Sequence, residues 1–213
     1  MPGQLYGHCE ICQHRTSRNR MAQHLLTHQD DSGDKGTLIE ARGHGPLGLY
    51  WLLVALPETA TLADLDDFLR KIWLGWDHLS SFVVDQTSYD SNYDHLQDGF
   101  TDPRADEDYL KGLFLEMNPN VDPVVLQQRV DASLARFVQH CDMNTPAQKA
   151  LSSKTSVVYE YDYGSTTTLE VTNLGSYCGD FSKPRLTLLA RNEVPDASPA
   201  DADIINSPRY YDD

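Results

Sequence analysis

The N-terminal segment HCEICQHRTSRNRMAQHLLTH carries the feature that most constrains the fold, a pair of cysteines followed by a pair of histidines. Cys9 and Cys12 are separated by two residues, and His24 and His28, four positions apart, follow after an interval of eleven residues. A structural zinc ion is held by four such ligands in a tetrahedron, two from a tight turn and two from one face of a helix. We therefore predict one Zn²⁺ ion bound by Cys9, Cys12, His24 and His28.

The same segment is too small to fold without help. A module of about 30 residues buries little apolar surface, so a bound metal ion would supply the missing stability. Met21 and Leu25 would form its small core. Four protein ligands leave no open coordination position, which a catalytic zinc ion needs. We therefore predict a structural site, with His8 and His14 as the nearby residues that could compete as ligands.

The remaining cysteines do not indicate a disulfide scaffold. The chain has four cysteines, and Cys141 and Cys178 stand alone in the sequence. A close cysteine pair with histidines nearby in an intracellular chain indicates a metal ion before it indicates a disulfide. The first residues contain no basic stretch followed by an apolar one, and no apolar run approaches the roughly 20 residues of a membrane span. We therefore expect a cytoplasmic protein without a membrane partner.

Charge is distributed unevenly: the formal net charge is −15, yet residues 1–29 carry three arginines against one acidic residue. The acidic remainder repels phosphate backbones and anionic membranes at long range. If the N-terminal module docked like a DNA-binding finger, Arg20 and Gln23 would face base edges. Arg15 and Arg18 would then lie near phosphates. One finger makes few contacts, so we favour a protein partner and keep nucleic acid as the alternative.

Composition divides the chain into four parts. Residues 1–29 form the zinc-finger-like module, and residues 30–46, rich in Gly, Asp and Ser, are typical of a linker. Residues 47–193 carry the strand and helix patterns of one domain. Residues 194–213 form an acidic tail with the composition of a poorly ordered end.

Within residues 47–193, hydrophobic periodicity first predicts a strand, a helix and another strand. The apolar run LGLYWLLVALP is typical of a buried strand. Leucines and aromatic residues then recur every three or four positions over residues 62–76, which predicts a helix that begins with a capping box of Thr61 and Asp64. Asp66 lies near the end of that helix where the dipole favours negative charge. The segment SSFVVDQTSY predicts the next strand.

The second half of the domain is less regular. Residues 90–120 are acidic, contain Pro and Gly and show no sustained period, so we predict mostly loop. Asp122 and Pro123 can begin a second helix, with Asp as the N-cap and Pro at the first helical position. The segment TSVVYEYDYGSTTTLEVTNL predicts a hairpin that turns at Gly164 and Ser165, and PRLTLLARN predicts a last strand. The chain is therefore expected to be α+β, with a mixed or antiparallel sheet packed by one or two helices and preceded by the zinc-finger-like module.

No catalytic constellation stands out. His78 is an acid–base candidate, but a lone histidine at a helix end is more often a cap or a packed residue. Cys178 has no neighbouring motif for a nucleophile, and Ser165 lacks the Gly-x-Ser-x-Gly setting of a hydrolase. We therefore predict a non-enzymatic interaction protein of unknown process, in which a structural zinc site is tethered to an acidic α+β domain. An enzyme of an unrecognised type is the remaining alternative.

Three segments of the domain resemble a known family. YWLLVALPETATLADLDDFLRKIWLGWDHLSSFVV, VVYEYDYGSTTTLEV and PRLTLLARNEVP are similar to the plasmid Orf-three-like family, named after a root-inducing plasmid and including insertion-element passenger proteins. The resemblance covers residues 47–195 and is weakest over residues 90–154. It implies an α+β fold, a short N-terminal Cys-x2-Cys module like the predicted zinc site, and an association with plasmids or mobile elements, but no activity. Relatives often carry further paired cysteines after the LLARNE segment; this chain lacks them, so a second zinc site is not expected.

Overall fold

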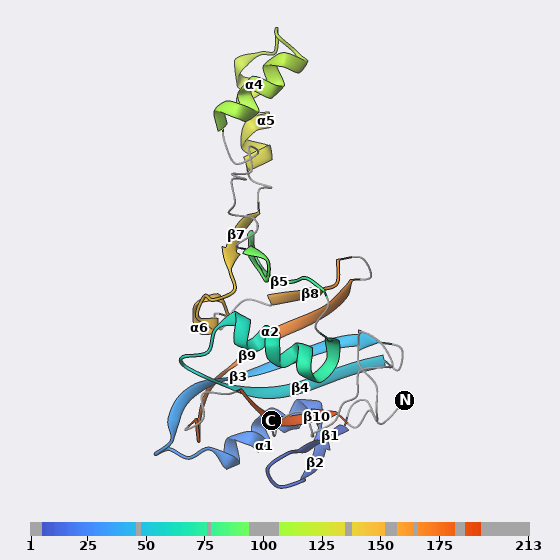
Figure 1. Ribbon diagram of the computed structural model, residues 1–213, viewed down its shortest axis with the longest axis vertical. Helices are drawn as coiled ribbons and strands as arrows, with labels where there is room; N and C mark the ends of the chain where they lie inside the picture. Colours follow the sequence, from blue (N-terminus) through green and yellow to red (C-terminus); the bar gives the residue numbers. More distant parts are fainter. Residues whose placement is uncertain are drawn as a thin grey trace.

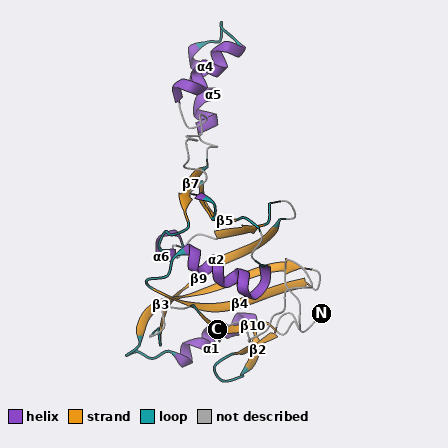
Figure 2. Ribbon diagram, viewed as in Figure 1, coloured by secondary structure: helices purple, strands orange, loops and turns teal. Residues whose placement is uncertain are grey.

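The computed structural model describes residues 6–45, 48–75, 78–93, 107–134, 138–151, 157–163, 166–181 and 186–192. These residues form one large sheet, short helices against it, and a pair of helices beyond one end (Figures 1 and 2). The strands are β1 (Tyr6–Cys9), β2 (Arg15–Ser17), β3 (Asp34–Gly45), β4 (Gly48–Pro57), β5 (Ser80–Val84), β6 (Thr87–Asp90), β7 (Gln139–Asp142), β8 (Val157–Tyr161), β9 (Thr167–Gly179) and β10 (Thr187–Asn192). The helical segments are α1 (Arg18–Leu25), η2 (Leu26–His28), α2 (Leu62–Leu69), η3 (Arg70–Leu74), α4 (Glu107–Met117), α5 (Pro123–Leu134) and α6 (Ala147–Ala150). The predicted α+β fold class is confirmed.

The sheet runs in the order β2-β1-β10-β4-β3-β9-β8-β5-β6-β7. Neighbouring strands are antiparallel except β6 and β7, which are parallel, so the sheet is mixed. β3 pairs with β4 on one side and with β9 on the other, and these long pairings form the centre of the sheet. The first described strand, β1, pairs with the last one, β10. The N-terminal segment is thus built into the same sheet as the C-terminal part of the described chain.

Strand β4 explains the longest apolar run of the sequence. Its residues alternate between the two faces of the sheet, and the strand is buried on both faces. One face contributes to a main core that includes α2, and the other contributes to a second core that includes α1. The main core takes Tyr50, Leu52, Val54 and Leu56, and the second core takes Trp51, Leu53 and Ala55. A strand buried on both faces needs apolar residues at every position, which is why the run is continuous.

Helix α2 begins as its sequence predicts. The Thr61 hydroxyl accepts a hydrogen bond from the Asp64 backbone N–H at 3.2 Å, and the Asp64 carboxylate accepts one from the Thr61 N–H at 2.8 Å. This reciprocal pair is the predicted capping box. The helix then widens into the π-helical turn η3, which ends at Gly75 with a φ of 114°, a conformation that residues with a side chain rarely adopt.

The structure differs from the linker predicted over residues 30–46. Asp34–Gly45 form β3, the strand with long pairings on both sides. Gly36 reflects close packing and not flexibility, because a Cβ at this position would lie 2.6 Å from the Phe181 ring. Ile39 in the same strand is fully buried. The segment whose composition resembles a linker therefore forms a central strand, in which a small residue allows a close contact.

The structure also corrects the loop predicted over residues 90–120. Glu107–Met117 form helix α4, and Pro123–Leu134 form the predicted second helix, α5. The carboxylate of Asp122 accepts hydrogen bonds from backbone N–H groups of the first turn of α5, as expected for an N-cap. In Figure 1 this helix pair lies at one end of the long axis of the molecule, away from the sheet. α4 was missed because Gly112 lies in its middle and lowers the helix propensity of an already short segment.

The predicted hairpin and the predicted last strand are both present. β8 and β9 pair with each other, while the turn predicted at Gly164 and Ser165 lies outside the described residues. Tyr159 and Tyr161 point into the main core, whereas Tyr163 is exposed. β10 occupies the segment PRLTLLARN, and the tail predicted over residues 194–213 lies outside the described residues.

Two glycines give opposite predictions for the same substitution. A Cβ at Gly7, in β1, would lie 2.6 Å from the Trp51 ring and would also collide with the Arg191 backbone, whereas a Cβ at Gly112, in α4, would meet no neighbouring group within 4 Å. We expect Gly7→Ala to lower the free energy of unfolding by about 1–3 kcal/mol through overpacking. Gly112→Ala should raise it by up to about 1 kcal/mol, because alanine favours a helix. Urea unfolding measures both variants, and a Gly7→Ala protein as stable as the wild type would disprove the close contact between β1 and β4.

Candidate metal centre

The first two strands enclose a tight turn that carries both cysteines. β1 ends at Cys9, and the chain turns through Cys12 and Gln13 to reach β2. Hydrogen bonds close the turn, from the Cys9 N–H to the His14 carbonyl at 3.0 Å and from the Gln13 N–H to the Cys9 carbonyl at 2.8 Å. Gln13 has a φ of 60°, the left-handed conformation in which a chain reverses sharply. Both thiols therefore come from one short loop.

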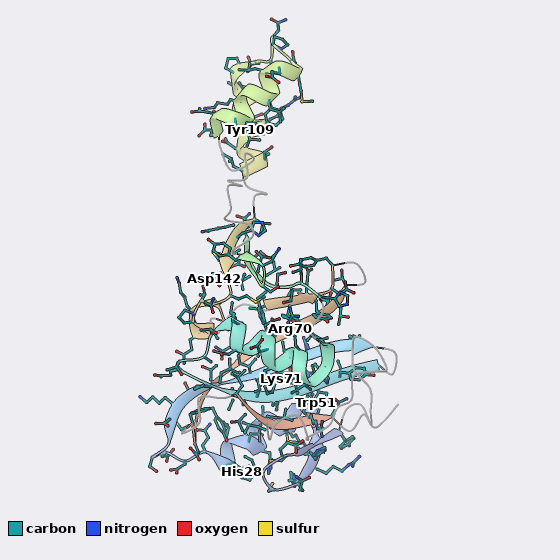
Figure 3. The ribbon with its side chains drawn as sticks, in the orientation of Figure 1. His28, Trp51, Arg70, Lys71, Tyr109 and Asp142 are labelled. Atoms are coloured by element: carbon teal, nitrogen blue, oxygen red, sulfur yellow. The ribbon has the colours of Figure 1, made fainter. Side chains whose placement is uncertain are left out.

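Helix α1 and the turn that follows it supply the two histidines. α1 ends at Leu25, and the 3-10 helical turn η2 continues the helical chain through His28. The Nε2 atoms of His24 and His28 lie 3.2 Å apart, and Cys12 Sγ lies 3.3 Å from His24 Nε2. The ligand atoms of all four predicted residues, Cys9 included, lie within 4.8 Å of one another. The structure thus brings the predicted ligands together at one point, close to His28 in Figure 3.

Two of these separations match those around a tetrahedral zinc ion. Zinc binds thiolate sulfur at about 2.3 Å and imidazole nitrogen at about 2.0–2.1 Å, so two nitrogen ligands stand about 3.3 Å apart and a sulfur and a nitrogen about 3.5 Å apart. The distances of 3.2 Å between His24 and His28 and of 3.3 Å between Cys12 and His24 agree with these values. Two imidazole nitrogens that face each other so closely need a proton or a metal ion between them. The donor set of two thiols and two imidazoles is one that structural zinc sites use.

Burial affects the protonation of both kinds of ligand. It raises the pKa of the Cys9 thiol, so a metal ion must displace a firmly held proton there. Burial, helped by the neighbouring His14 and His28 rings, lowers the pKa of His24. A neutral imidazole is the form that binds metal. His24 is therefore in the correct protonation state for a metal ion at neutral pH.

The metal centre shares its packing with the rest of the sheet. Met21 and Leu25 of α1 are fully buried in the second core, together with Trp51 of β4. Glu10, which lies between the two cysteines, forms an ion pair with Arg191 of β10 at 3.1 Å. The pairing of β1 with β10 adds backbone hydrogen bonds to these contacts. The buried side chains of the finger-like segment therefore belong to a core that this segment shares with the sheet.

The residues predicted as nucleic-acid contacts have different surroundings in the structure. Arg18 donates two hydrogen bonds to the Glu40 carboxylate of β3, at 2.7 and 2.6 Å, and this ion pair ties α1 to the sheet. Arg15 stacks over an aromatic ring of β1, 4.7 Å from the ring centroid. Arg20 and Gln23 are exposed on α1. Contact of these residues with nucleic acid stays a prediction, and Arg18 would have to leave Glu40 to take part.

A buried polar network, which the sequence did not reveal, joins α2 to the sheet. The Asp66 carboxylate accepts hydrogen bonds from Arg70 at 2.7 Å, from Ser80 at 2.7 Å and from the Tyr159 hydroxyl at 2.6 Å. Arg70 also donates to Ser80 at 2.6 Å and to the His78 carbonyl at 2.8 Å. Both charged side chains are therefore buried with hydrogen-bond partners, which is typical of a structural network. The signal in the sequence is the four-residue spacing of Asp66 and Arg70 on one helix.

His78 and His140 each lie beside a carboxylate. The acid–base candidate His78 is half exposed, and its Nδ1 lies 3.4 Å from Asp162. His140 Nδ1 lies 2.7 Å from Asp90, which also accepts a hydrogen bond from the Ser88 hydroxyl at 2.9 Å. A serine that donates to the carboxylate, and not to the histidine, is not activated as a nucleophile. The long sequence separation of His140 and Asp90 explains why no motif predicted their contact.

Comparison with known proteins finds few that are similar to this chain. No protein-family model matches it, and no curated protein matches it. Among solved structures, the chain is similar to the crystal structure of a protein of unknown function, MM3350 from Methanosarcina mazei Go1, with 12% sequence identity over 79% of this chain and 76% of that chain and a TM-score of 0.46. The resemblance to the plasmid Orf-three-like family stays a prediction, and an association with plasmids or mobile elements has no support in these comparisons. Within the described part of the chain, no helix combines the length and the apolar character needed to span a bilayer.

Proposed function

We propose that this protein is a zinc-binding, non-enzymatic interaction protein with one structural Cys2His2 site. The observation that carries the proposal is the convergence of four ligand atoms, from Cys9, Cys12, His24 and His28, within 4.8 Å of one another. Two thiolates and two imidazoles fill the four positions of a tetrahedral zinc ion and leave none for a substrate or a water molecule. The zinc ion then acts as a crosslink between the loop after β1 and helix α1.

The position of the site supports a structural role. α1 has eight residues, and a helix of this length is not stable in water without tertiary contacts. A metal ion bound at its C-terminal end would fix the helix over the second core and keep Trp51 covered. Binding of the ion therefore also stabilises the packing of β4 and β10 in the second core. The hydrogen-bonded pairing of Asp66 with Arg70 supports the non-enzymatic part of the proposal, because these buried charges already have partners.

A protein partner suits the charge of the chain better than nucleic acid does. The formal net charge of −15 repels a phosphate backbone at long range. Arg18, which a groove-binding finger would turn toward phosphate, is engaged with Glu40. Among the described residues, no observation of equal weight favours the nucleic-acid alternative or an unrecognised enzyme. A cytoplasmic location is part of the proposal, because thiol ligands stay reduced there.

Elemental analysis of the purified full chain tests the proposal. We expect about one zinc ion per chain in the wild type, because one set of four ligands holds one ion. Cys12→Ser should lose most of the zinc because it removes one of these ligands. Cys141→Ser, a matched change of another free cysteine in β7, should keep it. A zinc-free wild-type protein would refute the proposal, and full zinc content in Cys12→Ser would place the ion at other residues.

A further inference from the structure

Helix α4 carries a wider apolar face than its neighbour α5 covers. Leu110 of α4 and Val130 of α5 are buried, and the two helices pack against each other. Three further apolar side chains of α4 are exposed: Tyr109 by 48%, Leu113 by 39% and Met117 by 77%. They follow one another at steps of four residues and so form a continuous line on the helix surface. This line is the α4 stripe.

The α4 stripe lies far from the sheet. Figure 1 shows α4 and α5 at one end of the molecule, and in Figure 3 the labelled Tyr109 lies well away from Arg70 and Trp51 of the domain core. Large apolar side chains that are exposed side by side mark an interaction site on a soluble protein. Tyrosine and methionine are enriched at such sites, methionine because its flexible side chain adapts to a partner. The composition and exposure of the stripe therefore indicate a surface that binds another protein.

The charge around the stripe indicates the kind of partner. Glu116 is next to Met117 in the sequence and three positions from Leu113, so it borders the stripe. Lys111 of α4 forms an ion pair with Glu107, at 2.5 Å, which offsets its positive charge. Over residues 107–134 there are five carboxylates and two cations, and the whole chain has a formal net charge of −15. Two copies of this chain would repel each other on approach, whereas a basic partner would be attracted.

We propose that the α4 stripe docks a basic amphipathic helix of another protein. The inference rests on the proposed function, because it supplies the contact site of an interaction protein. Apolar residues of the incoming helix, spaced by three and four positions, would pack along Tyr109, Leu113 and Met117. Its lysines or arginines would lie beside Glu116.

Binding of a synthetic helix to the zinc-loaded full chain tests the inference. The probe is a labelled peptide of about 18 residues, long enough to form a helix on binding, with leucines along one face and lysines on the other. The reference probe has the same composition in scrambled order, which keeps the charge and removes the apolar face. Fluorescence anisotropy at physiological ionic strength measures the affinity of both. We expect the amphipathic peptide to bind at least about tenfold more tightly than the scrambled one.

A pair of matched variants locates the contact on α4. Leu113→Ser/Met117→Ser removes most of the stripe, and we expect it to weaken peptide binding by about tenfold or more. Leu115→Ser is the control, because Leu115 is as exposed as Leu113 (41% and 39%) but lies on another side of the helix. It should bind as the wild type does. Circular dichroism of each variant checks that the helices are retained.

Several outcomes would overturn the inference. Equal binding of both peptides would show that charge alone drives the contact. Equal weakening by Leu115→Ser and by the double variant would show that the contact is not made by the α4 stripe. A dimer in sedimentation velocity that Leu113→Ser/Met117→Ser dissociates would assign the stripe to a second copy and remove the basic partner. Zinc content measured on the same sample separates the two proposals. A zinc-loaded protein that does not bind the peptide would refute only this inference. A zinc-free protein would refute the proposed function, whether or not the peptide binds.

Discussion

Removal of the zinc ion is expected to destabilise the sheet as well as the N-terminal segment. Without the ion, α1 loses its link to the loop of Cys9 and Cys12, and its eight residues cannot hold a helix alone. Met21 and Leu25 then leave the second core. Burial of one such side chain stabilises a fold by about 1.5–3 kcal/mol, so we expect the free energy of unfolding to fall by about 3–6 kcal/mol. Thermal unfolding of Cys12→Ser, or of the wild type with a chelator, measures this loss.

Hydrogen exchange shows where the stability is lost. We expect faster exchange at the backbone amides of β1, β10 and β4, because departure of α1 uncovers their side of the second core. Cys12 is preferred to Cys9 for the substitution because its side chain is exposed and does not support the core. Cys141→Ser controls for the loss of a thiol. If faster exchange stayed within residues 6–28 and the melting temperature did not change, the segment would be a tethered module, as the sequence suggested.

Asp66→Ala is expected to lower the free energy of unfolding by about 3–5 kcal/mol, because it leaves the Arg70 guanidinium buried without its carboxylate. Asp66 and Arg70 are each 6% exposed, so water cannot easily replace the lost partner. The carboxylate also accepts hydrogen bonds from Ser80 and from Tyr159, which lose their acceptor. Burial, together with Asp66, raises the pKa of Tyr159 far above its usual range, so the hydroxyl stays protonated and acts as a donor. Urea unfolding measures the effect.

Two companion variants separate the buried charge from the hydrogen bonds. Tyr159→Phe removes one hydroxyl and should lower the free energy of unfolding by only about 1 kcal/mol. Asp66→Leu/Arg70→Met removes both charges, so we expect it to be more stable than Asp66→Ala alone. A double variant less stable than the single one would show that the ion pair itself, and not the unpaired charge, determines the effect.

Local patterns in the sequence predicted the elements that depend on neighbouring residues. The capping box of Thr61 and Asp64, the N-cap at Asp122 and the buried strand β4 all follow from short-range rules, and the structure has each of them. The convergence of the four predicted metal ligands was also predictable, because two residues lie in one turn and two are four positions apart in a helical segment. Such signals need no knowledge of the rest of the chain.

Contacts between distant parts of the chain were not predictable in the same way. The pairing of β1 with β10 joins residues more than 180 positions apart, and nothing in either segment identifies its partner. β3 has the composition of a linker, yet one of its glycines, Gly36, is required by close packing against β4 and Phe181, a contact that exists only in the folded sheet. The ion pair of Arg18 with Glu40 depends on that same strand. A linker over residues 30–46 makes the predicted zinc site a separate module, whereas β3 joins that site to the sheet.

X-ray absorption spectroscopy at the zinc edge, on the purified full chain, tests the central claim most directly. A closed structural site made by Cys9, Cys12, His24 and His28 predicts two sulfur ligands at about 2.3 Å and two imidazole nitrogens at about 2.0–2.1 Å, with no oxygen ligand. That result would establish zinc as the crosslink between the cysteine loop and α1. A site with one sulfur, or with a bound water oxygen in place of a protein ligand, would contradict the claim and show an open coordination position.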